Sequence, residues 1–341
     1  MRIAQVAPLY ESVPPRLYGG TERVVSHLTE ELVRRGHLVT LFATGDSVTN
    51  AELVSAIPES LRLSRSTEFL CSYALQLEQV RKRASEFDIV HLHDNFSSLP
   101  VLHVTKSKFL STLHGRLDLP IHQTLFNTFR EMPVVSISWS QRRPISTANW
   151  VGNVYHGIPL NGNIFAEDPG GDYLAFLGRL SPEKGVEKAI EIARRAGMKL
   201  KIAGKVDAVD VEYFREQVAP LLKPSRVEFL GEIEDRDKPS FLGNACAVLF
   251  PIAWPEAFGL VLIESMAAGA PVIAWRRASV PEIIEEGVTG FVVETVDDAV
   301  AAIDQVPSLD REVIRKRFKE RFSVERMACD YLSIYETLLA R

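Results

Sequence analysis

The feature that most constrains the fold is the alternation of two kinds of segment along the chain. Short apolar runs rich in β-branched residues alternate with amphipathic stretches of helical spacing. This order is typical of βαβ units, which build parallel sheets. The pattern occurs twice, and 341 residues exceed the size at which one hydrophobic core keeps growing. The sequence therefore predicts an α/β protein with two doubly wound, parallel-sheet domains.

Each half of the chain supplies a set of strand candidates. A helix is predicted over 21–35, because Val24, Leu28 and Leu32 recur at helical spacing and Gly36 can end it. Strands in the first half are predicted at Arg2 to Ala7, Leu38 to Ala43, Ile89 to Leu92, Phe109 to Leu113 and Val134 to Ile137. Those in the second half are predicted at Tyr173 to Leu177, Leu200 to Ala203, Val227 to Leu230, Ala247 to Phe250, Val272 to Ala274 and Phe291 to Val293.

The domain boundary is predicted within residues 153–173, which are dense in Gly, Pro, Asn and Asp. Residues 1–155 form the first predicted domain and residues 156–322 the second. The last segment, 323–341, begins with Ser323 as a helix cap, and its apolar residues lie on one helical face. These residues are Met327, Tyr331, Ile334, Tyr335 and Leu338. Such a helix needs an apolar groove to lie in.

The bulk composition excludes several classes of protein. The formal net charge of −5 argues against a nucleic-acid binder, because phosphate contacts need a basic surface. Cys71, Cys246 and Cys329 are far apart and form no CxxC pair, which favours the reducing cytoplasm and no disulfide or zinc site. We find no signal peptide and no apolar run long enough to span a membrane. Membrane contact is therefore expected to be at most peripheral, at the inner membrane face.

Candidate binding residues follow the predicted strands, because ligands of open α/β sheets lie beyond the carboxyl ends of strands. The cleft between two such domains is the default site. Neither a GxGxxG nor a P-loop motif occurs. After the first strand, Gly19 and Gly20 directly precede a helix, where backbone N–H groups can approach an anion. A simple turn is the alternative explanation of this glycine pair.

A more specific arrangement follows the first strand of the second half. In LGRLSPEKG, Arg179 and Lys184 lie beyond a strand end, and Pro182 can open the next helix. An arginine that bonds two oxygens and a lysine that acts as a point charge suit a diphosphate. Two solvated basic residues are the alternative.

The segment PEAFGLVLIESMAAGAP, 255–271, is a loop that breaks into a nearly apolar helix, yet it carries Glu256 and Glu264. A buried carboxylate needs a partner. The N–H groups at the helix start, 259–261, can hold the same diphosphate, while Glu264 accepts from ribose hydroxyls and Glu256 reaches the sugar. Alternatively, Glu256 caps the helix dipole and Glu264 faces solvent.

Together these motifs resemble the retaining glycosyltransferases of family 4. The resemblance rests on Glu256 and Glu264 at their spacing, the upstream GRLSPEKG, the glycine pair, DIVHLHD at 88–94 and TLHG at 112–115. They occur in the family's order over nearly the whole chain. The resemblance implies a GT-B fold, in which two Rossmann-like domains face each other across a cleft. The acceptor would bind the first domain and the nucleotide sugar mainly the second, and the last helix would cross back to the first domain.

The resemblance also implies roles for individual residues. Arg179 and Lys184 would bind the diphosphate, Glu264 the ribose and Glu256 the donor sugar. His114 would lie near that sugar and help to place it. Gly231 and Glu232 would meet the base of the nucleotide. The full set of expected donor and nucleotide contacts outside the catalytic residues is Gly19, Gly20, Gly231, Glu232, Phe258, Gly259, Leu260, Val261 and Glu264.

No metal site is expected. His91 and His93 alternate on one strand face beside Asp94, a spacing that suits a metal, but the matching stretch of the family binds none. The DRD at 235–237 mimics a metal-binding DxD motif of another glycosyltransferase fold. Acidic residues are expected there simply from the dipole of the helix that follows.

The sequence therefore predicts a hexosyltransferase that moves a sugar from a nucleoside diphosphate to an acceptor hydroxyl with retention of configuration, without a metal or other cofactor. UDP, GDP and dTDP sugars stay open as donors, because 156–159 and 203–205 depart from the family's pattern. The acceptor, a small molecule, a glycan or a lipid-linked sugar, would be selected by divergent loops. A nucleotide-sugar epimerase or hydrolase, or a non-catalytic nucleotide-sugar binding protein, is the alternative on this scaffold.

Overall fold

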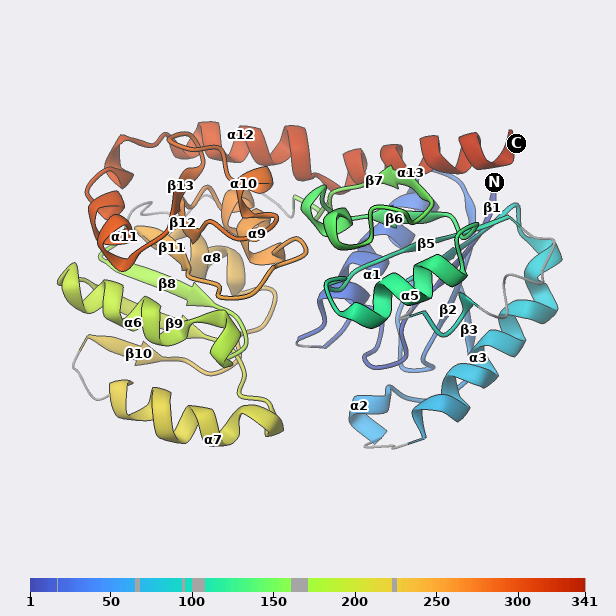
Figure 1. Ribbon diagram of the computed structural model, residues 1–341, viewed down its shortest axis with the longest axis horizontal. Helices are drawn as coiled ribbons and strands as arrows, with labels where there is room; N and C mark the ends of the chain where they lie inside the picture. Colours follow the sequence, from blue (N-terminus) through green and yellow to red (C-terminus); the bar gives the residue numbers. More distant parts are fainter. Residues whose placement is uncertain are drawn as a thin grey trace. The chain divides into compact units, whose positions relative to one another are not determined.

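The chain folds into two compact α/β units, each built around its own parallel sheet (Figure 1). The computed structural model describes residues 1–16, 18–64, 68–93, 96–99, 108–160, 171–222 and 226–340. Unit 1 comprises Met1–Pro159 and Ser323–Arg341, and unit 2 comprises Leu160–Phe322. The prediction of two Rossmann-like domains is confirmed.

The sheet of unit 1 has seven strands in the order β3-β2-β1-β4-β5-β6-β7, and every neighbouring pair is parallel. The bounds are β1 Arg2–Val6, β2 Leu38–Ala43, β3 Glu52–Ser55, β4 Ile89–Leu92, β5 Phe109–Thr112, β6 Val134–Ser136 and β7 Trp150–Asn153. The sequence prediction found the five inner strands and missed β3 and β7. These two strands form the edges of the sheet and are only partly buried, so they lack the apolar run that marks a central strand.

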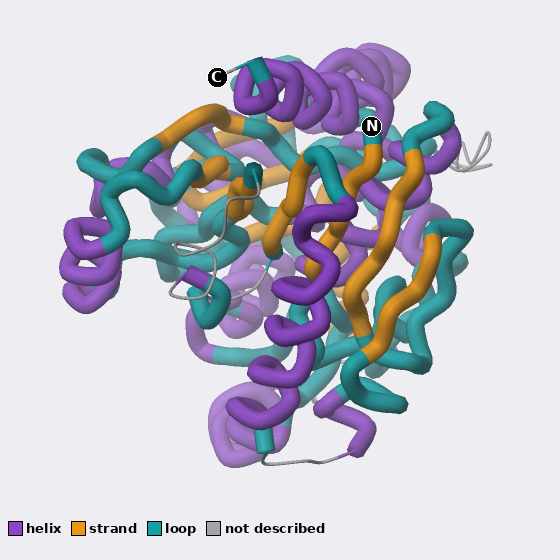
Figure 2. The backbone as a smooth tube through the Cα atoms, turned by 90° about the vertical axis from the view of Figure 1, so that its right-hand side faces the viewer, coloured by secondary structure: helices purple, strands orange, loops and turns teal. Residues whose placement is uncertain are grey.

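Helices cover this sheet, as Figure 2 shows for the face of unit 1 turned to the viewer. Their bounds are α1 Gly20–Arg34, α2 Leu61–Ser64, α3 Phe69–Arg83, α5 Pro120–Thr128 and α13 Val324–Leu339, with 3-10 turns at Ala84–Glu86 and Ser140–Ile145. Helix α1 buries Val24, Leu28 and Leu32, and the chain leaves it through Gly36, whose φ of 84° favours glycine. The predicted helix is thus confirmed, with both its ends one residue earlier than predicted.

Helix α13 belongs to unit 1 although it ends the chain. The Ser323 side chain accepts a hydrogen bond from the Arg326 backbone N–H and caps the helix, as the sequence predicts. The guanidinium of Arg326 in turn donates to the backbone oxygens of Tyr155 and His156. The predicted apolar face is buried except for Ile334, which is only partly buried. These contacts join the start of α13 to Tyr155 and His156, near the end of the segment Met1–Pro159.

A row of polar side chains lies under α13, on the inner strands of the sheet. Gln5 of β1 and His91 of β4 stand opposite each other, and both are fully buried. His93 follows β4 and is 1% exposed, and Thr112 ends β5 and is fully buried. His114, two residues after Thr112, completes the row. Burial of polar groups at this depth is costly unless they are hydrogen-bonded, and these groups bond to one another.

The sheet of unit 2 has six parallel strands in the order β10-β9-β8-β11-β12-β13. The bounds are β8 Tyr173–Leu177, β9 Lys199–Ala203, β10 Val227–Phe229, β11 Ala247–Phe250, β12 Val272–Trp275 and β13 Gly290–Val293. All six strands were predicted from the sequence to within one residue at each end. The strands β8, β11, β12 and β13 are buried along their whole length, which explains their continuous apolar runs.

The helices Val186–Arg195 and Val296–Ile303 of unit 2 bury an apolar core against this sheet. The helix bounds of the unit are α6 Val186–Arg195, α7 Val211–Tyr213, α8 Lys238–Gly243, α9 Leu260–Ala267, α10 Val280–Ile283, α11 Val296–Ile303 and α12 Arg311–Phe322. A π-helical turn spans Phe214–Val218, and 3-10 turns lie at Pro182–Lys184, Ala208–Asp210, Ala219–Leu222 and Val306–Ser308. Part of the predicted interdomain turn, residues 161–170, lies outside the described residues.

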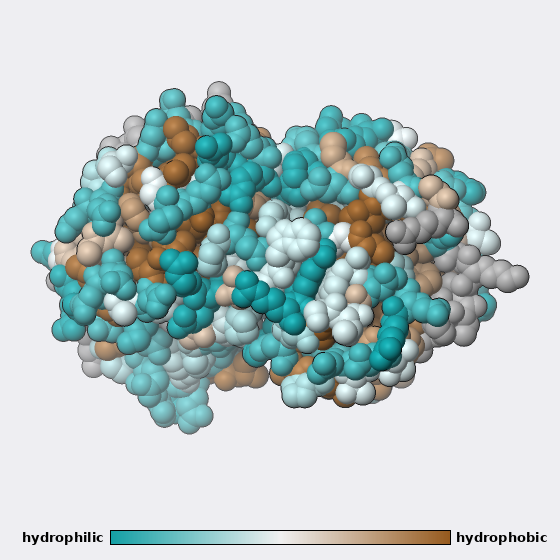
Figure 3. Space-filling model, turned by 45° about the horizontal axis from the view of Figure 1, so that its top comes forward, coloured by the Kyte–Doolittle hydropathy of each residue, from teal (hydrophilic) through white to brown (hydrophobic). Residues whose placement is uncertain are grey.

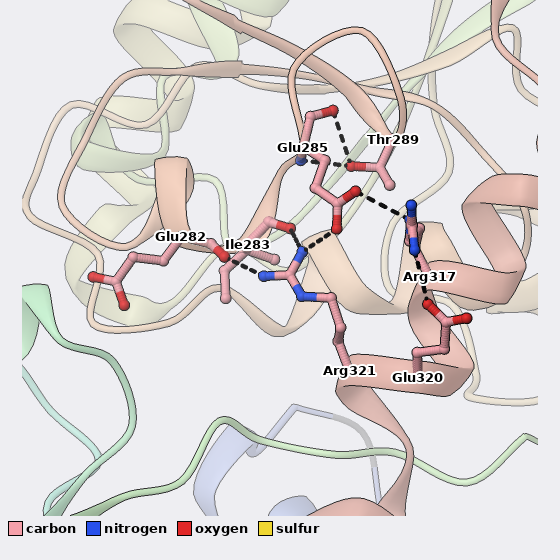
Figure 4. A network of polar contacts seen from close by, with 7 residues as sticks. All are labelled: Glu282, Ile283, Glu285, Thr289, Arg317, Glu320 and Arg321. Carbon is pink, nitrogen blue, oxygen red and sulfur yellow. Dashed lines mark hydrogen bonds and ion pairs between the residues drawn. The ribbon is translucent and has the colours of Figure 1, made fainter.

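Helix α12 is fastened to the loop after α10 by two arginines (Figure 4). Arg321 donates to the backbone oxygens of Glu282 and Ile283 and pairs with the Glu285 carboxylate at 2.8 Å. Arg317 reaches the same carboxylate at 3.2 Å. The carbonyls at the end of α10, which have no helical partner, are thereby satisfied. The network holds α12 on unit 2 up to its last turn, directly before the chain passes to Ser323.

The face shown in Figure 3 is mostly hydrophilic, with hydrophobic residues in patches between the polar ones. This mixture agrees with a charged fraction of 24%. None of the helices in the described ranges combines the length and the apolar composition that crossing a membrane requires.

The buried histidines of unit 1 predict a loss of stability in mild acid. Burial lowers the pKa of His91, His93 and His156 well below the ordinary 6.5, and that of His114 to about 3. As the pH falls below about 6.5, these histidines are therefore protonated in the unfolded chain but stay neutral in the folded chain. Each of them lowers the free energy of unfolding by about 1.4 kcal/mol per pH unit. Burial raises the pKa of Glu22 to about 7. Between about pH 7 and 4.5, Glu22 therefore binds a proton in the folded chain but not in the unfolded chain, which raises the free energy of unfolding as the pH falls.

Urea unfolding at pH 7.5 and pH 5.5 measures this effect. We expect the unfolding free energy to fall by several kcal/mol, and the His114→Asn variant to lose about 1.4 kcal/mol less per pH unit than the wild type. Equal stability at the two pH values would contradict neutral, buried histidines.

Candidate active site

Charged residues of unit 2 follow three neighbouring strands. The predicted Arg179 follows β8 and the predicted Glu256 follows β11, while Asp207, which the sequence prediction did not include, follows β9. These strands lie side by side in the order β9-β8-β11. Because the strands are parallel, their carboxyl ends lie at one edge of the sheet. After β8 the chain adds β9 and β10 on one side of the sheet, and after β11 it adds β12 and β13 on the other side. The strand order therefore reverses between β8 and β11. Open α/β sheets bind ligands at such a topological switch point.

Lys184 is positioned by a close approach of two loops. Gly185, directly after it, has a φ of 72°, and a Cβ atom there would lie 2.2 Å from the Pro251 backbone oxygen. Only glycine fits this position. The Ala253 N–H also donates to the Glu183 backbone oxygen at 2.8 Å. These contacts bring the loop after β8 against the loop after β11.

The result is an ion pair between Lys184 and Glu256. The Lys184 Nζ lies 2.7 Å from the Glu256 Oε2, and the two side chains are 16% and 15% exposed. The Trp254 indole N–H donates to the same carboxylate oxygen at 3.3 Å, and its ring lies 5.2 Å from the Lys184 Nζ. Two residues that are far apart in the sequence and were both predicted to contact the donor are therefore in direct contact. The N-cap of the helix that follows is Gly259, without a side-chain cap, and the Glu256 carboxylate is paired with Lys184.

Arg179 is surrounded by carboxylates. It pairs with Glu183, with Asp207 at 3.5 Å and with Asp210 at 3.6 Å. Burial raises the pKa of Asp210, and the Arg179 charge opposes this rise. Lys205 adds a second cation, 2.8 Å from Asp207 and 6% exposed. Arg179 is thus not a solvated surface residue, and an anionic ligand would have to compete with these carboxylates for it.

The N-cap of helix α9 is Gly259, which has a φ of 90° and a left-handed conformation. The first residues of the helix, Leu260 and Val261, are partly exposed, whereas Phe258 is buried. The Ser279 Oγ lies 2.9 Å from the backbone oxygens of both Glu256 and Phe258. This buried hydroxyl, which the sequence prediction did not include, fixes the loop that leads into the helix.

Glu264 has a partner in the protein, which the sequence prediction missed. Its Oε1 lies 3.4 Å from the Lys238 Nζ, and both side chains are mostly buried, at 14% and 18% exposure. Lys238 also pairs with Asp235 at 2.9 Å. Lys238 begins α8, directly after the DRD at 235–237, so the acidic stretch binds the cation that reaches Glu264. Glu264 is not directed freely into solvent.

Gly231 and Glu232 lie farther along the same sheet. They follow β10, which is an edge strand separated from β8 by β9. Gly231 has a φ of 72°, and its backbone oxygen accepts from the Gly204 N–H at 2.8 Å. Glu232 is exposed. The loop is therefore shaped by glycine, while the Glu232 side chain is available for contact.

In unit 1, Gly19 is the N-cap of α1 and Gly20 is its first residue, so the helix starts one residue earlier than predicted. A Cβ atom at Gly19 would lie 2.7 Å from the Pro15 Cβ, so the packing of the loop requires glycine here. A second residue of this helix start was not predicted. Glu22 is only 6% exposed, and burial, with a smaller contribution from nearby Glu11, raises its pKa to about 7. A carboxyl group with a raised pKa thus lies in the first turn of α1.

His114 is part of the polar row under α13. Its Nε2 lies 2.9 Å from the His93 Nδ1, and its ring stacks on that of His156 with centroids 5.2 Å apart. Its Nδ1 is buried, and no group in the described ranges is hydrogen-bonded to it. His91 and His93 use their nitrogens for hydrogen bonds within the row, and Asp94 lies outside the described residues. Within the described residues, no cluster of three or more His, Cys, Asp or Glu side chains is arranged to hold a metal ion.

Comparison with known families follows the two units. Residues 18–151 match Glycosyltransferase Family 4, and residues 161–321 match Glycosyl transferases group 1. An uncharacterised glycosyltransferase of Methanocaldococcus jannaschii is 27% identical over 98% of this chain and 98% of its own. The phosphatidyl-myo-inositol mannosyltransferase of Mycobacterium leprae is 26% identical over 99% of this chain and 97% of its own.

Solved structures share the fold over the full length. Sucrose-phosphate synthase of Thermosynechococcus elongatus has a TM-score of 0.80 at 19% identity and covers 99% of both chains. HepE of Anabaena, solved in complex with UDP and glucose, has a TM-score of 0.74 at 20% identity and covers 100% of both chains. With two parallel-sheet units, family matches over both of them and relatives along its whole length, the chain belongs to the family 4 glycosyltransferases of GT-B fold.

Proposed function

We propose that this glycosyltransferase moves a hexose from a nucleoside diphosphate to an acceptor hydroxyl, with retention at the anomeric carbon and without a metal ion. The observation that carries the proposal is the grouping of Arg179, Lys184 and Glu256 at the carboxyl edge of the unit 2 sheet. The mannosyltransferase relatives and the UDP complex of HepE support a nucleotide-sugar donor.

The diphosphate would be bound by the cations of unit 2. Arg179 can bond two oxygens through its planar guanidinium, and Lys184 can follow the shifting charge. The N–H groups at the start of α9 face no helical acceptor, so they can bind the same anion. As the bond to the sugar breaks, the leaving diphosphate gains negative charge, and these preorganised groups stabilise it. They supply the positive charge that a divalent cation provides in other transferases.

The ribose would be bound by Glu264 and the sugar by Glu256. A carboxylate accepts from the two neighbouring hydroxyls of a ribose through charge-assisted hydrogen bonds. The Lys238 contact at 3.4 Å is longer than an ideal hydrogen bond, so the Glu264 carboxylate keeps acceptor capacity for the ribose. In unit 1, His114 is proposed to contact the transferred sugar.

Retention is proposed to follow from departure and attack on the same face of the sugar, with a phosphate oxygen taking the acceptor proton. Double displacement would need a carboxylate free to attack the anomeric carbon. Glu256 is the candidate for that role, but we assign its carboxylate to the hydroxyl groups of the donor sugar once the diphosphate has drawn Lys184 away from it.

The acceptor is proposed to bind unit 1, in the cytoplasm or at the inner face of the membrane. The relatives act on different acceptors: the mycobacterial proteins are named for phosphatidyl-myo-inositol and an Escherichia coli relative for the O-antigen chain. A lipid-linked or glycan acceptor fits this range. UDP, GDP and dTDP sugars are all candidate donors.

Replacing Lys184 tests the diphosphate site. We expect Lys184→Ala to lower kcat roughly 100-fold or more, because one preorganised positive group is lost from the leaving diphosphate. The matched control is Lys188→Ala in α6, where the exposed lysine pairs with Glu191 at 3.2 Å. Transfer from UDP-, GDP- and dTDP-hexoses to detergent-solubilised lipid and glycan acceptors is the measurement. Unchanged kcat in Lys184→Ala would refute the role of this lysine.

Metal removal is a separate test. We expect the initial transfer rate to be the same in excess EDTA as in untreated enzyme, because Arg179 and Lys184 supply the charge. A loss of activity that Mg²⁺ or Mn²⁺ restores would overturn metal independence and leave the transferase assignment intact.

Replacing Glu264 tests the nucleotide site. We expect Glu264→Gln to weaken binding of the matching nucleoside diphosphate about 10-fold, since a hydrogen bond to a charged group contributes about 1.5 kcal/mol or more. Lys238 keeps Asp235 as its partner, so the substitution leaves no unpaired cation. Calorimetry with UDP and GDP, whose riboses carry both hydroxyls, measures the effect, with Glu191→Gln as the exposed control. Removing the ribose hydroxyls of the ligand should abolish the difference between variant and wild type, and a difference that persists would contradict the ribose contact.

A further inference from the structure

The Asp207 carboxylate lies between two cations of unit 2. Its Oδ1 lies 2.8 Å from the Lys205 Nζ, and its Oδ2 lies 3.5 Å from the Arg179 Nη1. Each oxygen of this carboxylate therefore faces a different positive charge. Because the attraction between charges weakens with distance, the pair with Lys205 is the stronger of the two. Asp207 is thus shared unequally between a lysine and the arginine assigned to the diphosphate.

The backbone holds Lys205 at this place. The Leu180 N–H donates to the Lys205 backbone oxygen at 2.8 Å. A Cβ atom at Gly204, directly before Lys205, would collide with the Gly178 backbone oxygen, so only glycine fits there. These contacts join the loop after β9, which carries Lys205, to the loop after β8, which carries Arg179.

Lys205 is more deeply buried than the two residues beside it. Its side chain is 6% exposed, against 26% for Arg179 and 28% for Asp207. A ligand at the sheet edge can therefore reach Arg179, whereas the Lys205 charge acts on that ligand through Asp207. A buried ammonium group is costly without a partner, so we expect Lys205 to keep Asp207 when a ligand binds.

Arg179 is surrounded by three carboxylates that compete with an anionic ligand. It pairs with Glu183, Asp207 and Asp210. The ligand must displace them, and a carboxylate that loses its cation at a partly buried edge is costly. Among the described residues, Glu183 and Asp210 form ion pairs with Arg179 alone, whereas Asp207 has Lys205 as a second cation. Asp207 can therefore leave Arg179 and still be paired with a positive charge.

We propose that Lys205 is a positioning residue of the diphosphate site, which retains the Asp207 carboxylate and so leaves the Arg179 guanidinium to an anionic ligand. In the free protein Asp207 is shared between the two cations. With a diphosphate bound, Asp207 belongs to Lys205 and its contact with Arg179 is broken. The identity of the ligand as a diphosphate rests on the proposed function. The stretch 203–205, which departs from the family's pattern, thereby gains a role in donor binding.

Replacing Lys205 tests this role in the full-length protein. Calorimetry measures the binding of UDP, GDP and dTDP, and the nucleotide that binds the wild type most tightly is used throughout. We expect Lys205→Met to weaken binding about 10-fold, because Asp207 then turns fully to Arg179. The control is Lys199→Met, which breaks an exposed pair with Asp172 at the other end of β9 and should bind like the wild type. Unchanged binding in Lys205→Met would overturn the inference.

A second substitution shows whether Lys205 acts through Asp207. In the double variant Lys205→Met with Asp207→Asn, the competing carboxylate is removed, so binding should return to within about 3-fold of the wild type. Lys205→Met with Glu212→Gln removes an exposed carboxylate of α7 instead, has the same net charge and should stay weakened. Failure of Asp207→Asn to restore binding, or equal restoration by Glu212→Gln, would contradict the inference. A lysine with a merely structural role would not be rescued by removing its own partner.

The Arg179→Gln variant separates this inference from the proposed function. If Arg179→Gln binds the nucleotide like the wild type, the diphosphate site is wrong and the inference falls with it. If Arg179→Gln loses binding but Lys205→Met does not, the site stands and only the role of Lys205 is wrong.

A structure of the wild type with the bound nucleotide gives the answer without any variant. We expect the Lys205 Nζ to stay at its present 2.8 Å from Asp207, while the Arg179 guanidinium leaves Asp207 for a phosphate oxygen. A bound structure in which Asp207 stays on Arg179, or leaves Lys205, would overturn the inference.

Discussion

The ion pair between Lys184 and Glu256 is the contact on which the organisation of the unit 2 edge depends. It joins the loop after β8 to the loop after β11, across the point where the strand order reverses. Taking either charge out of water alone would be costly, so each residue makes the burial of the other acceptable. Gly185 makes the pair possible by letting the backbone of Pro251 approach it. The positive charge of Arg179 is likewise paired with the carboxylates of Asp207 and Asp210.

These ion pairs also indicate how a ligand would bind. In the free protein each of these cations is paired with a carboxylate, so the side chains are ordered before a diphosphate arrives. In the proposed function, a diphosphate would replace the carboxylates at Arg179 and Lys184, which would then turn to solvent, to hydroxyl groups of the ligand or, for Asp207, to Lys205. Unit 1 uses a different principle. Its polar row is made of neutral side chains, and burial keeps His114 neutral, so these groups form hydrogen bonds without adding charge.

Much of this arrangement could be predicted from the sequence. The spacing of apolar residues and the charged residues that follow each strand can both be read from neighbouring positions in the chain. The inner strands, α1 and the face of α13 all follow from spacing, and Arg179, Lys184 and Glu256 follow from their places after strands. The edge strands β3 and β7 could not be found in this way, because a partly exposed strand lacks an apolar run. Lys238, which pairs with Glu264, lies on another helix, and Tyr335 lies 244 residues from His91. Contacts of that range depend on the packed fold.

A crystal structure with a bound nucleoside diphosphate tests the central claim most directly. The account predicts that the diphosphate lies within hydrogen-bonding distance of the Arg179 guanidinium and the start of α9, and that the Lys184 Nζ moves from the Glu256 carboxylate to a phosphate oxygen. A diphosphate bound elsewhere, or one that leaves the pair of Lys184 and Glu256 unchanged at 2.7 Å, would contradict it.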